Sequence, residues 1–258
     1  MMMQAGHRRP LFVLYGASMV EYAFRPEGWG AALTNMYSRQ ADVLLRGYKG
    51  WNTRRALEAL ETIFPKNSPI PPSLVVIFFG TNDAAFPLPS GRGQYVPILE
   101  YKDNLRHICS YMMGLSDTTR VILIAPPPIF EEARRTVARV RFGEKAAEYL
   151  DRTNERTRAY AEACISVAQE MGAGVVNLWS AIQKKSNWQT ECLSDGMHLS
   201  AEGGKILLEE LLTVIKSENW VPSLIAEHMR SDFTEPSPYD MIHPYLEAAQ
   251  SCNETALL

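Results

Sequence analysis

The sequence has no long hydrophobic run. Its first apolar run, "LFVLY" at residues 11–15, is bounded by Pro10 and Gly16, and no later run approaches the roughly 18 apolar residues of a membrane helix. Basic residues precede this first run, but a secretory signal needs an apolar core of about 7–15 residues. We therefore expect a soluble cytoplasmic protein without a membrane span.

The sequence also lacks an excess of positive charge. Its 26 lysines and arginines are balanced by 29 aspartates and glutamates, so the formal net charge is −3. Without a global basic field, nucleic acids and anionic membranes are not expected partners. Basic pairs such as Arg54-Arg55 and Arg134-Arg135 have acidic residues nearby, which is typical of solvated helix faces.

Cysteine is scarce and scattered. The four cysteines, which form no C-x-x-C pair, are Cys109, Cys164, Cys192 and Cys252. A disulfide framework or a zinc cluster is therefore not expected. The pattern fits free thiols in a reducing compartment.

Five short apolar runs indicate β-strands. They lie at residues 11–15, 41–46, 73–79, 120–125 and 174–179. Most are continuous rather than alternating, which is typical of strands buried on both faces of a parallel sheet. Because segments with helical spacing lie between them, the pattern predicts an α/β fold, a doubly wound parallel sheet with helices on both faces. With 258 residues, the chain suits one large domain spanning 1–258.

Three of the intervening segments show helical periodicity. Segment 54–64 places Leu57, Leu60 and Phe64 on one face. The helix that precedes the fifth run is expected to end at Gly172, a natural C-cap. The last helix is expected to follow Ser200, a suitable N-cap.

Two segments break the alternation of strands and helices. Consecutive prolines are expected to exclude helix from the segment 125–135. The tail at 220–245 holds four prolines and little periodicity. We interpret residues from about 218 to 258 as an extended C-terminal arm over the surface of the domain.

Residues suited to acyl transfer follow several of the predicted strands. In a doubly wound sheet the binding site lies beyond the carboxyl ends of the strands, at a topological switch point. The residues at these positions are Ser18 after the first run, Gly47 and Gly50 after the second, Asn82 and Asp83 after the third, and Asp195 and His198 well beyond the fifth.

A serine, a histidine and an aspartate from this set can form a catalytic triad. The Ser18 hydroxyl is a weak nucleophile and needs a base to take its proton. His198 can be that base if Asp195 fixes its tautomer and orientation. Because these two residues are three positions apart, with Gly196 between them, one turn can place both side chains on the same side.

The attacked carbonyl becomes an oxyanion, and each donor aimed at it is worth roughly 3–4 kcal/mol. The candidate donors are the backbone N–H of Ser18, the backbone N–H of Gly50 and the side-chain amide of Asn82. Gly47 is the less favoured alternative to Gly50. Asp83 is expected to brace the loops rather than to react.

Several other residues have ordinary structural interpretations. Taken alone, Ser18 fits a helix N-cap and Asn82 fits an Asx turn, so their assignment depends on the complete set. Trp29 and Trp51 are expected in the core or in a wall, although Trp51 can also line an acyl pocket. The remaining histidines, none of which follows a late strand with an acidic residue three positions before it, are His7, His107, His228 and His243.

The same residues lie in four ordered blocks, "YGASMV", "RGYKGWNTR", "FFGTNDAAF" and "SDGMHLSAEG". These blocks resemble those of the SGNH hydrolases, also called the GDSL esterase/lipase family. Longer stretches such as "IFPKNSPIPPSLVVIFFGTND" and "IAPPPIFEE" are similar to its isoamyl-acetate-hydrolysing esterase branch, particularly the plant-type members. The resemblance covers roughly residues 10–225. It implies a three-layer α/β/α sandwich with a five-stranded parallel sheet, ester hydrolysis through an acyl-enzyme, and no metal or organic cofactor.

The sequence departs from this family at one position. The family usually has Gly-Asp-Ser at the nucleophile, whereas Ala17 stands before Ser18 here. The missing aspartate is not the triad acid, a role that the resemblance gives to Asp195, so its loss is expected to weaken the bracing of the Ser18 loop.

We predict a serine esterase for small, short-chain esters of the acetyl type. The alternatives are a carbohydrate O-acetylesterase, a lysophospholipase, and a binding protein with impaired turnover; the oligomeric state stays open.

Overall fold

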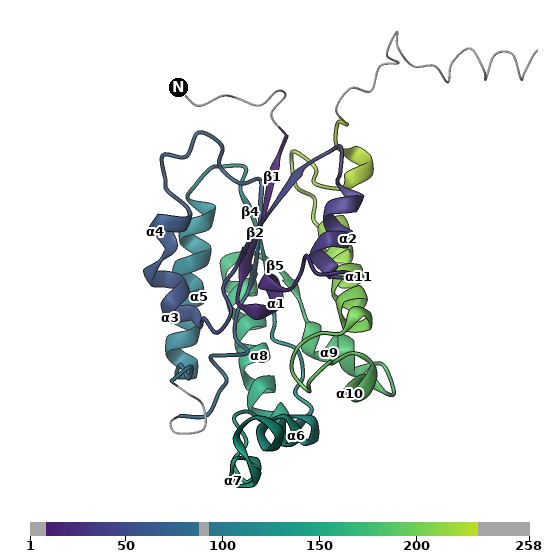
Figure 1. Ribbon diagram of the computed structural model, residues 1–258. Helices are drawn as coiled ribbons and strands as arrows, with labels where there is room; N and C mark the ends of the chain where they lie inside the picture. Colours follow the sequence, from purple (N-terminus) through teal and green to yellow (C-terminus); the bar gives the residue numbers. More distant parts are fainter. Residues whose placement is uncertain (1–8, 88–92, 232–258) are drawn as a thin grey trace, which may run out of the picture.

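A computed structural model describes residues 9–87 and 93–231 of the chain. It contains one sheet of five parallel strands in the order β2-β1-β3-β4-β5, with helices packed on both faces. The strands are β1 (Leu11–Gly16), β2 (Asp42–Gly47), β3 (Leu74–Phe78), β4 (Arg120–Ile124) and β5 (Gly174–Val176). Figure 1 shows the three layers edge-on. The predicted α/β/α sandwich with five parallel strands is confirmed.

The register of the central strands determines where the loops begin. Gly16, the last residue of β1, pairs with Gly47 of β2 on one side and with Phe78 of β3 on the other. The three strands therefore end almost level with one another. Because the strand order reverses between β1 and β3, this edge is the topological switch point of the sheet, where such folds bind ligands.

One face of the sheet is covered by helices from the middle of the chain, α3 (Thr53–Glu58), α4 (Leu60–Ile63), α5 (Ile98–Met113) and α8 (Asn154–Met171). Buried Tyr15 and Ile77 of the sheet pack with Ile108 and Val167 of these helices. The single helix predicted at 54–64 is instead two short helices that meet at Ala59. The predicted end of the helix before the fifth strand, α8, is confirmed, because Gly172 has the left-handed φ of 65°.

The other face is covered by α2 (Trp29–Met36), α9 (Leu178–Gln183) and α11 (Ala201–Ser217). Phe12 and Leu14 of β1 pack here with Leu207 and Leu211 of α11. The predicted N-cap of α11 is confirmed, because the Ser200 hydroxyl accepts a hydrogen bond from the backbone N–H of Gly203. The alternation of faces along β1 thus divides the apolar side chains between two core layers.

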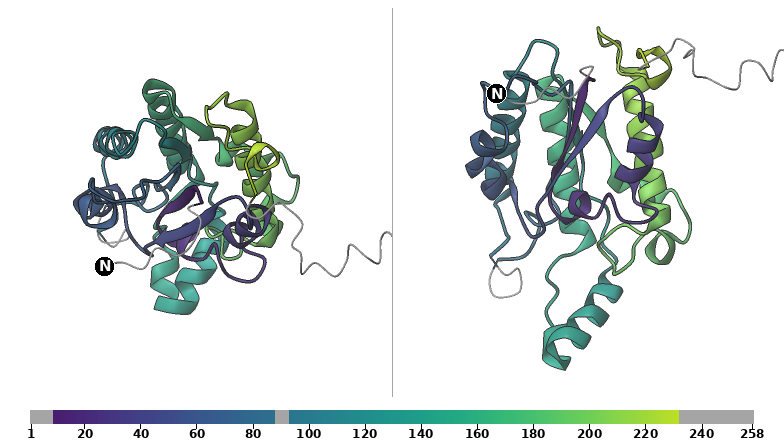
Figure 2. Two further views of the ribbon diagram at one scale, coloured as in Figure 1. Left: turned by 90° about the horizontal axis from the view of Figure 1, so that it is seen from above. Right: turned by 45° about the horizontal axis from the view of Figure 1, so that its top comes forward.

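The remaining helices are short or lie at the ends of the sheet: α1 (Ser18–Glu21), α6 (Glu131–Phe142), α7 (Glu144–Ala147), α10 (Trp188–Glu191) and a 3-10 turn (Ala226–His228). Figure 2 shows α6 and α7 projecting beyond the carboxyl ends of the strands, in the direction away from the described ends of the chain.

Three further predictions about secondary structure need correction. The strand predicted at 174–179 ends at Val176, because the Asn177 side chain accepts a hydrogen bond from the N–H of Ser180 and starts α9. The prolines at 126–128 exclude helix only locally, since α6 begins at Glu131 within the segment 125–135. The second strand, β2, is not buried on both faces, because it lies at the edge of the sheet and is mostly half-exposed.

The described part of the predicted C-terminal arm, up to residue 231, packs near the amino ends of the strands. The Tyr37 hydroxyl donates to the Leu224 carbonyl, and Arg120 of β4 donates to the Val221 carbonyl. The rest of the arm lies outside the described residues. Within the described residues, no helix is both long enough and apolar enough to cross a membrane.

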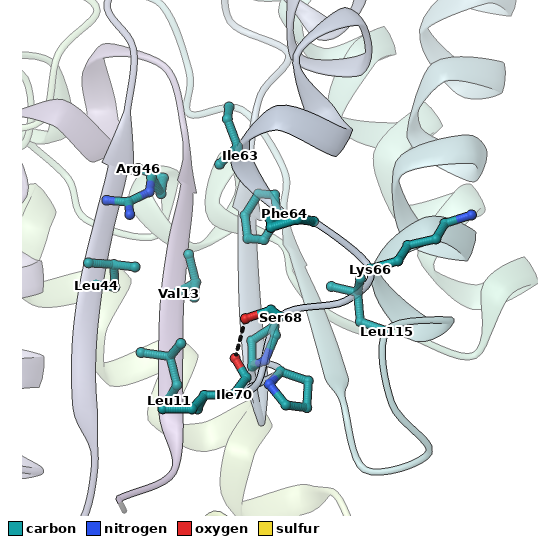
Figure 3. A pocket seen from close by; sticks show the side chains of 13 residues that line it. Leu11, Val13, Leu44, Arg46, Ile63, Phe64, Lys66, Ser68, Ile70 and Leu115 are labelled. Atoms are coloured by element: carbon teal, nitrogen blue, oxygen red, sulfur yellow. Dashed lines mark hydrogen bonds between the residues drawn. The ribbon is translucent and has the colours of Figure 1, made fainter. Parts of the chain in front are cut away.

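An apolar hollow of about 170 Å³ lies on the sheet face beside the edge strand. Figure 3 shows Leu11 and Val13 of β1, Leu44 of β2, and Phe64 and Ile70 of the loop after α4 around it. Leu11 is the first residue of β1, whereas the switch point lies at the other end of the strand, at its last residue Gly16. The hollow is therefore separate from the edge where the site was predicted.

Close packing of β2 on α1 gives a test of this arrangement. A Cβ atom added to Gly47 would lie 2.0 Å from the backbone nitrogen of Glu21, so Gly47→Ala forces α1 away from the sheet. We expect this variant to lower the free energy of unfolding by about 1–3 kcal/mol or more, measured by urea denaturation. Gly114→Ala is the control, because its nearest contact would be 3.3 Å; equal effects of the two substitutions would contradict the packing.

Candidate active site

Ser18 lies where β1 gives way to α1, of which it is the first residue. The chain is held at this point by hydrogen bonds from the Ala17 N–H to the Phe78 carbonyl and from the Val20 N–H to the Ala17 carbonyl. The Ser18 side chain is largely buried, and its Oγ lies 3.0 Å from Nε2 of His198, 180 residues away in the sequence. The fold thus brings a hydroxyl and an imidazole into hydrogen-bonding contact.

Asp195 and His198 meet within one tight turn, as their spacing predicts. Asp195 Oδ1 accepts hydrogen bonds from the N–H groups of Met197 and His198, and Oδ2 lies 2.9 Å from His198 Nδ1. A carboxylate only accepts, so this contact places the imidazole proton on Nδ1. In the neutral ring, Nε2 is then free to accept the proton of the Ser18 hydroxyl. Gly196 adopts a left-handed φ of 79°, which allows the turn.

The Asp195 carboxylate is strongly stabilised in its charged form. Burial by itself would raise the pKa of Asp195, but the hydrogen bonds from His198 and the nearby Arg134 charge outweigh it. The pKa of this carboxyl is therefore held well below its usual range. An ionised Asp195 can stabilise a protonated His198, as the carboxylate of a catalytic triad does in acyl transfer.

The sequence interpretation of Arg134 as part of a solvated helix face is wrong. Arg134 is only 8% exposed, and its guanidinium binds the Asp151 carboxylate at 2.8 Å. It also lies 3.6 Å from Asp195 Oδ2. The first turn of α6 is tied to the same region, because the Phe130 N–H donates to the Gly196 carbonyl. Arg134 therefore belongs to the surroundings of the Asp195–His198 pair.

Three candidate oxyanion donors line one pocket of about 110 Å³ together with the Ser18–His198 pair. Within the described part of the chain, the backbone N–H groups of Ser18 and Gly50 donate to no acceptor. Gly50 has a left-handed φ of 83°, and a Cβ atom added there would meet the Gln94 side-chain amide at 3.5 Å. Gly47, the alternative donor, does not line the pocket and is packed against the backbone of α1.

The third candidate donor, Asn82, has a fixed side-chain amide. Its Nδ2 donates to the Trp51 carbonyl at 2.7 Å, and its Oδ1 accepts from Arg152 at 3.0 Å. One of the two Nδ2–H groups thus stays available for a substrate oxygen. The described residues contain no cluster of three or more potential metal ligands.

Asp83 braces two loops, as the sequence predicted. Its Oδ1 accepts hydrogen bonds from both the backbone N–H and the hydroxyl of Thr53, which begins α3 behind the Gly50 loop. Asp83 is completely buried, and its Oδ2 has no hydrogen-bond partner within the described residues. Burial raises the pKa of Asp83 to about 6, and the bonds from Thr53 oppose the rise.

The remaining aromatic and histidine candidates lie elsewhere. Trp29 is buried in the core, with its Nε1 donating to the Met19 carbonyl, and Trp51 stacks on Tyr48 at 4.2 Å. His107 is exposed on α5, and His228 is part of the terminal 3-10 turn. His7 and His243 lie outside the described residues.

Comparisons with known proteins identify the family of this chain. The family model for the GDSL-like lipase/acylhydrolase family matches residues 14–206, which include every residue of the candidate site. The chain belongs to this family. It is a carboxylic ester hydrolase of the GDSL type.

Relatives support the same assignment. The GDSL esterase/lipase WDL1 of Oryza sativa subsp. japonica is 49% identical over 91% of this chain and 88% of its own length. The human isoamyl acetate-hydrolyzing esterase 1 homolog is 35% identical over 89% of this chain and 90% of its own length.

Solved structures of lower sequence identity share the fold. A lipase/acylhydrolase from Enterococcus faecalis superposes with a TM-score of 0.63 at 18% identity, covering 88% of this chain and all of its own. Axe2, an acetylxylan esterase from Geobacillus stearothermophilus, gives a TM-score of 0.62 at 19% identity, covering 81% of this chain and 95% of its own. At these identities the likeness concerns the architecture of the sheet and its helices.

Reasoning from the sequence missed several polar residues that line the pocket, among them Gln94, Arg134 and Arg152. None of these three lies directly after a predicted strand or in a family block. Arg152 precedes α8 in a polar segment, where an arginine is usually solvated. Only contacts between residues distant in the sequence reveal their positions, so no local signal could have found them.

The raised pKa of Asp83 predicts a specific pH dependence of stability. Between about pH 4 and 6 the unfolded chain loses this proton while the folded chain retains it, so the free energy of unfolding falls as pH rises, by roughly 1.4 kcal/mol per unit. Asp83→Asn keeps an acceptor for Thr53 and removes the titration. Urea denaturation at several pH values should show that the difference in free energy of unfolding between the wild type and Asp83→Asn changes across this pH window. A difference that stays constant would contradict the prediction.

Proposed function

We propose that the protein hydrolyses short-chain, acetyl-type esters through an acyl-enzyme on Ser18. Ser18 Oγ attacks the ester carbonyl while His198 Nε2 takes its proton. His198 then protonates the departing alcohol, and Asp195 holds the imidazole and stabilises its charged form. Water, activated by His198, releases the acid and restores Ser18. The observation that carries this proposal is the unbroken contact from Ser18 Oγ through His198 to Asp195, at 3.0 and 2.9 Å.

In the same proposal, three donors hold the oxyanion of the tetrahedral intermediate. They are the backbone N–H groups of Ser18 and Gly50 and the side-chain amide of Asn82. Support comes from their common pocket and from the absence of competing acceptors for the two backbone groups among the described residues. The carboxylic ester then reacts without a metal ion, because neutral amide donors stabilise the developing charge.

The size of the pocket supports a small acyl group. Its volume of about 110 Å³ is below the roughly 300–1,000 Å³ of pockets that enclose drug-sized ligands. A long acyl chain, as in a lysophospholipid, would also need an apolar lining. The pocket is lined mainly by polar and charged side chains, which favours an acetyl-sized acyl group over a lipid chain.

The polar lining also favours a second candidate, deacetylation of a carbohydrate. Lys49, Gln94 and Arg141 lie around the same pocket and can hydrogen-bond to sugar hydroxyls of the alcohol portion. This reaction uses the same acyl-enzyme chemistry and differs only in the leaving group. We further propose that residues 1–258 act as one hydrolase domain. The described part of its C-terminal arm, up to residue 231, packs near the amino ends of the strands, away from the pocket.

Removal of the nucleophile tests the proposed chemistry. Ser18→Ala deletes one hydroxyl, so we expect turnover to fall by about 10⁴-fold or more without loss of the fold. The assay uses p-nitrophenyl esters from acetate to laurate together with acetylated oligosaccharides, with circular dichroism as the folding control. The wild type should prefer acetate over laurate. Unchanged turnover in Ser18→Ala, or preference for laurate, would contradict the proposal.

A fluorophosphonate probe separates the esterase from a binding protein that has lost turnover. The probe reacts with an activated serine, so it should label the wild type and leave Ser18→Ala unlabelled. If the wild type stays unlabelled while control esterases react, the protein is a binder on an esterase scaffold.

Restoration of the family aspartate tests the departure at position 17. Ala17 is the N-cap of α1 and makes no side-chain capping bond. In Ala17→Asp, the carboxylate can accept a hydrogen bond from the first turn of the helix and brace the Ser18 loop. We expect kcat for p-nitrophenyl acetate to be equal to or higher than that of the wild type. A collapse of kcat in a folded variant would show that alanine is required here.

A further inference from the structure

We infer that Arg152 is the positioning residue of the oxyanion hole, orienting Asn82 directly and Gly50 through Gln94. This inference rests on the proposed function, because it assigns a role in the hydrolysis at Ser18. Arg152 lies just before α8, is only 3% exposed, and lines the same pocket as the triad.

The guanidinium of Arg152 is held by several fixed acceptors. Its Nε donates to the Thr81 carbonyl at 2.7 Å, and Nη1 donates to Asp151 Oδ2 at 2.6 Å. Its Nη2 donates both to Asn82 Oδ1 at 3.0 Å and to Gln94 Oε1 at 2.6 Å. A planar fork of donors can serve these acceptors together, which the single ammonium of a lysine cannot do in the same geometry.

The partners of Asn82 have fixed polarity, so they determine which end of its amide faces each way. A guanidinium only donates and a backbone carbonyl only accepts. Arg152 therefore requires Oδ1 on its side, and the Trp51 carbonyl requires Nδ2 on the other. This leaves the second Nδ2–H for the substrate. Without Arg152, buried Oδ1 has lost its charged donor, and the amide can turn its oxygen toward the oxyanion.

Gln94 extends the same control to the second donor. Its Oε1 accepts from Arg152, and its Nε2 donates to the Gly50 carbonyl at 3.1 Å. The Gln94 carbonyl in turn accepts from the side chain of Asn52, which caps α3. Gly50 adopts a left-handed φ of 83°, and the hydrogen bond from Gln94 helps to hold its peptide groups in this conformation. Arg152 thus reaches both oxyanion donors that lie outside the Ser18 loop.

Asp151 completes the arrangement from the opposite side. Its Oδ2 accepts from Arg152, and its carboxylate also binds Arg134, which lies 3.6 Å from Asp195. The Arg152 guanidinium is therefore charge-compensated and held before any substrate arrives. Donors fixed in advance need no reorganisation as the oxyanion forms, and they therefore lower the barrier rather than strengthen substrate binding.

The test is a double-mutant cycle between Arg152→Met and Asn82→Ala, with kcat and KM measured on p-nitrophenyl acetate. We expect Asn82→Ala to lower kcat by about 10²–10³-fold, as for loss of one oxyanion donor. Arg152→Met should lower kcat by about 10-fold or more with little change in KM. When Asn82 is already alanine, Arg152→Met can affect only Gly50, through Gln94. The fall in kcat that Arg152→Met causes in the Asn82→Ala protein should therefore be no larger than the fall that Gln94→Leu causes in the wild type.

Two further variants make the cycle decisive. Arg152→Lys keeps the charge but not the planar fork, so it should fold even if Arg152→Met does not, and it should still lower kcat. Arg156→Met is the matched control. This arginine lies nearby on α8 and donates to the Ala84 carbonyl, but it contacts neither Asn82 nor Gln94 in the described structure. It should retain kcat.

The outcomes separate this inference from the proposed function. If Ser18→Ala retains turnover, the proposed nucleophile is wrong, whatever the cycle shows. If Ser18→Ala is inactive, an equal effect of Arg152→Met with and without Asn82 would overturn the positioning role, as would wild-type kcat in Arg152→Lys. A change confined to KM would also overturn it, because the donors act on the transition state.

Discussion

The level ends of three parallel strands are the constraint on which the site depends. Gly16 pairs with Gly47 on one side and with Phe78 on the other, so the loops after β1, β2 and β3 leave the sheet at one edge. The next helices diverge, because α2 packs on one face and α5 on the other. The pocket at this edge receives the serine of one loop and the amide donors of the others. Backbone pairing in the sheet thus sets the distances among residues far apart in the sequence.

A second constraint is electrostatic. An alternating series of buried or half-buried groups runs from Asn82 through Arg152, Asp151 and Arg134 to Asp195. Each guanidinium lies beside a carboxylate, so no charge of the series is buried without compensation. The oxyanion side and the acid side of the proposed site share the anchor Asp151. Their relative placement is therefore determined by ion pairs as well as by the sheet.

The sequence predicted those features whose cause is local. Strands buried on both faces are continuous apolar runs, and the turn between Asp195 and His198 follows from their spacing. The strand β5 was predicted too long, because the cap formed by Asn177 overrides an apolar stretch. Arg134 and Arg152 could not be placed, since an arginine in a polar segment is normally solvated and their acceptors become neighbours only after folding. The role of a charged side chain such as Arg134 or Arg152 depends on contacts with distant residues, which the spacing of residues in the sequence does not reveal.

The position of α6 and α7 has a consequence for the thermal range of activity. Arg134 lies on α6 and Asp151 follows α7, and Figure 2 shows these two helices projecting beyond the sheet. Segments with less burial open at a lower free energy than the central strands. Opening of this segment would release the ion pairs to Asp195 and Arg152 while the sheet stays intact. Heating should therefore inactivate the enzyme at a temperature below that at which the sheet unfolds.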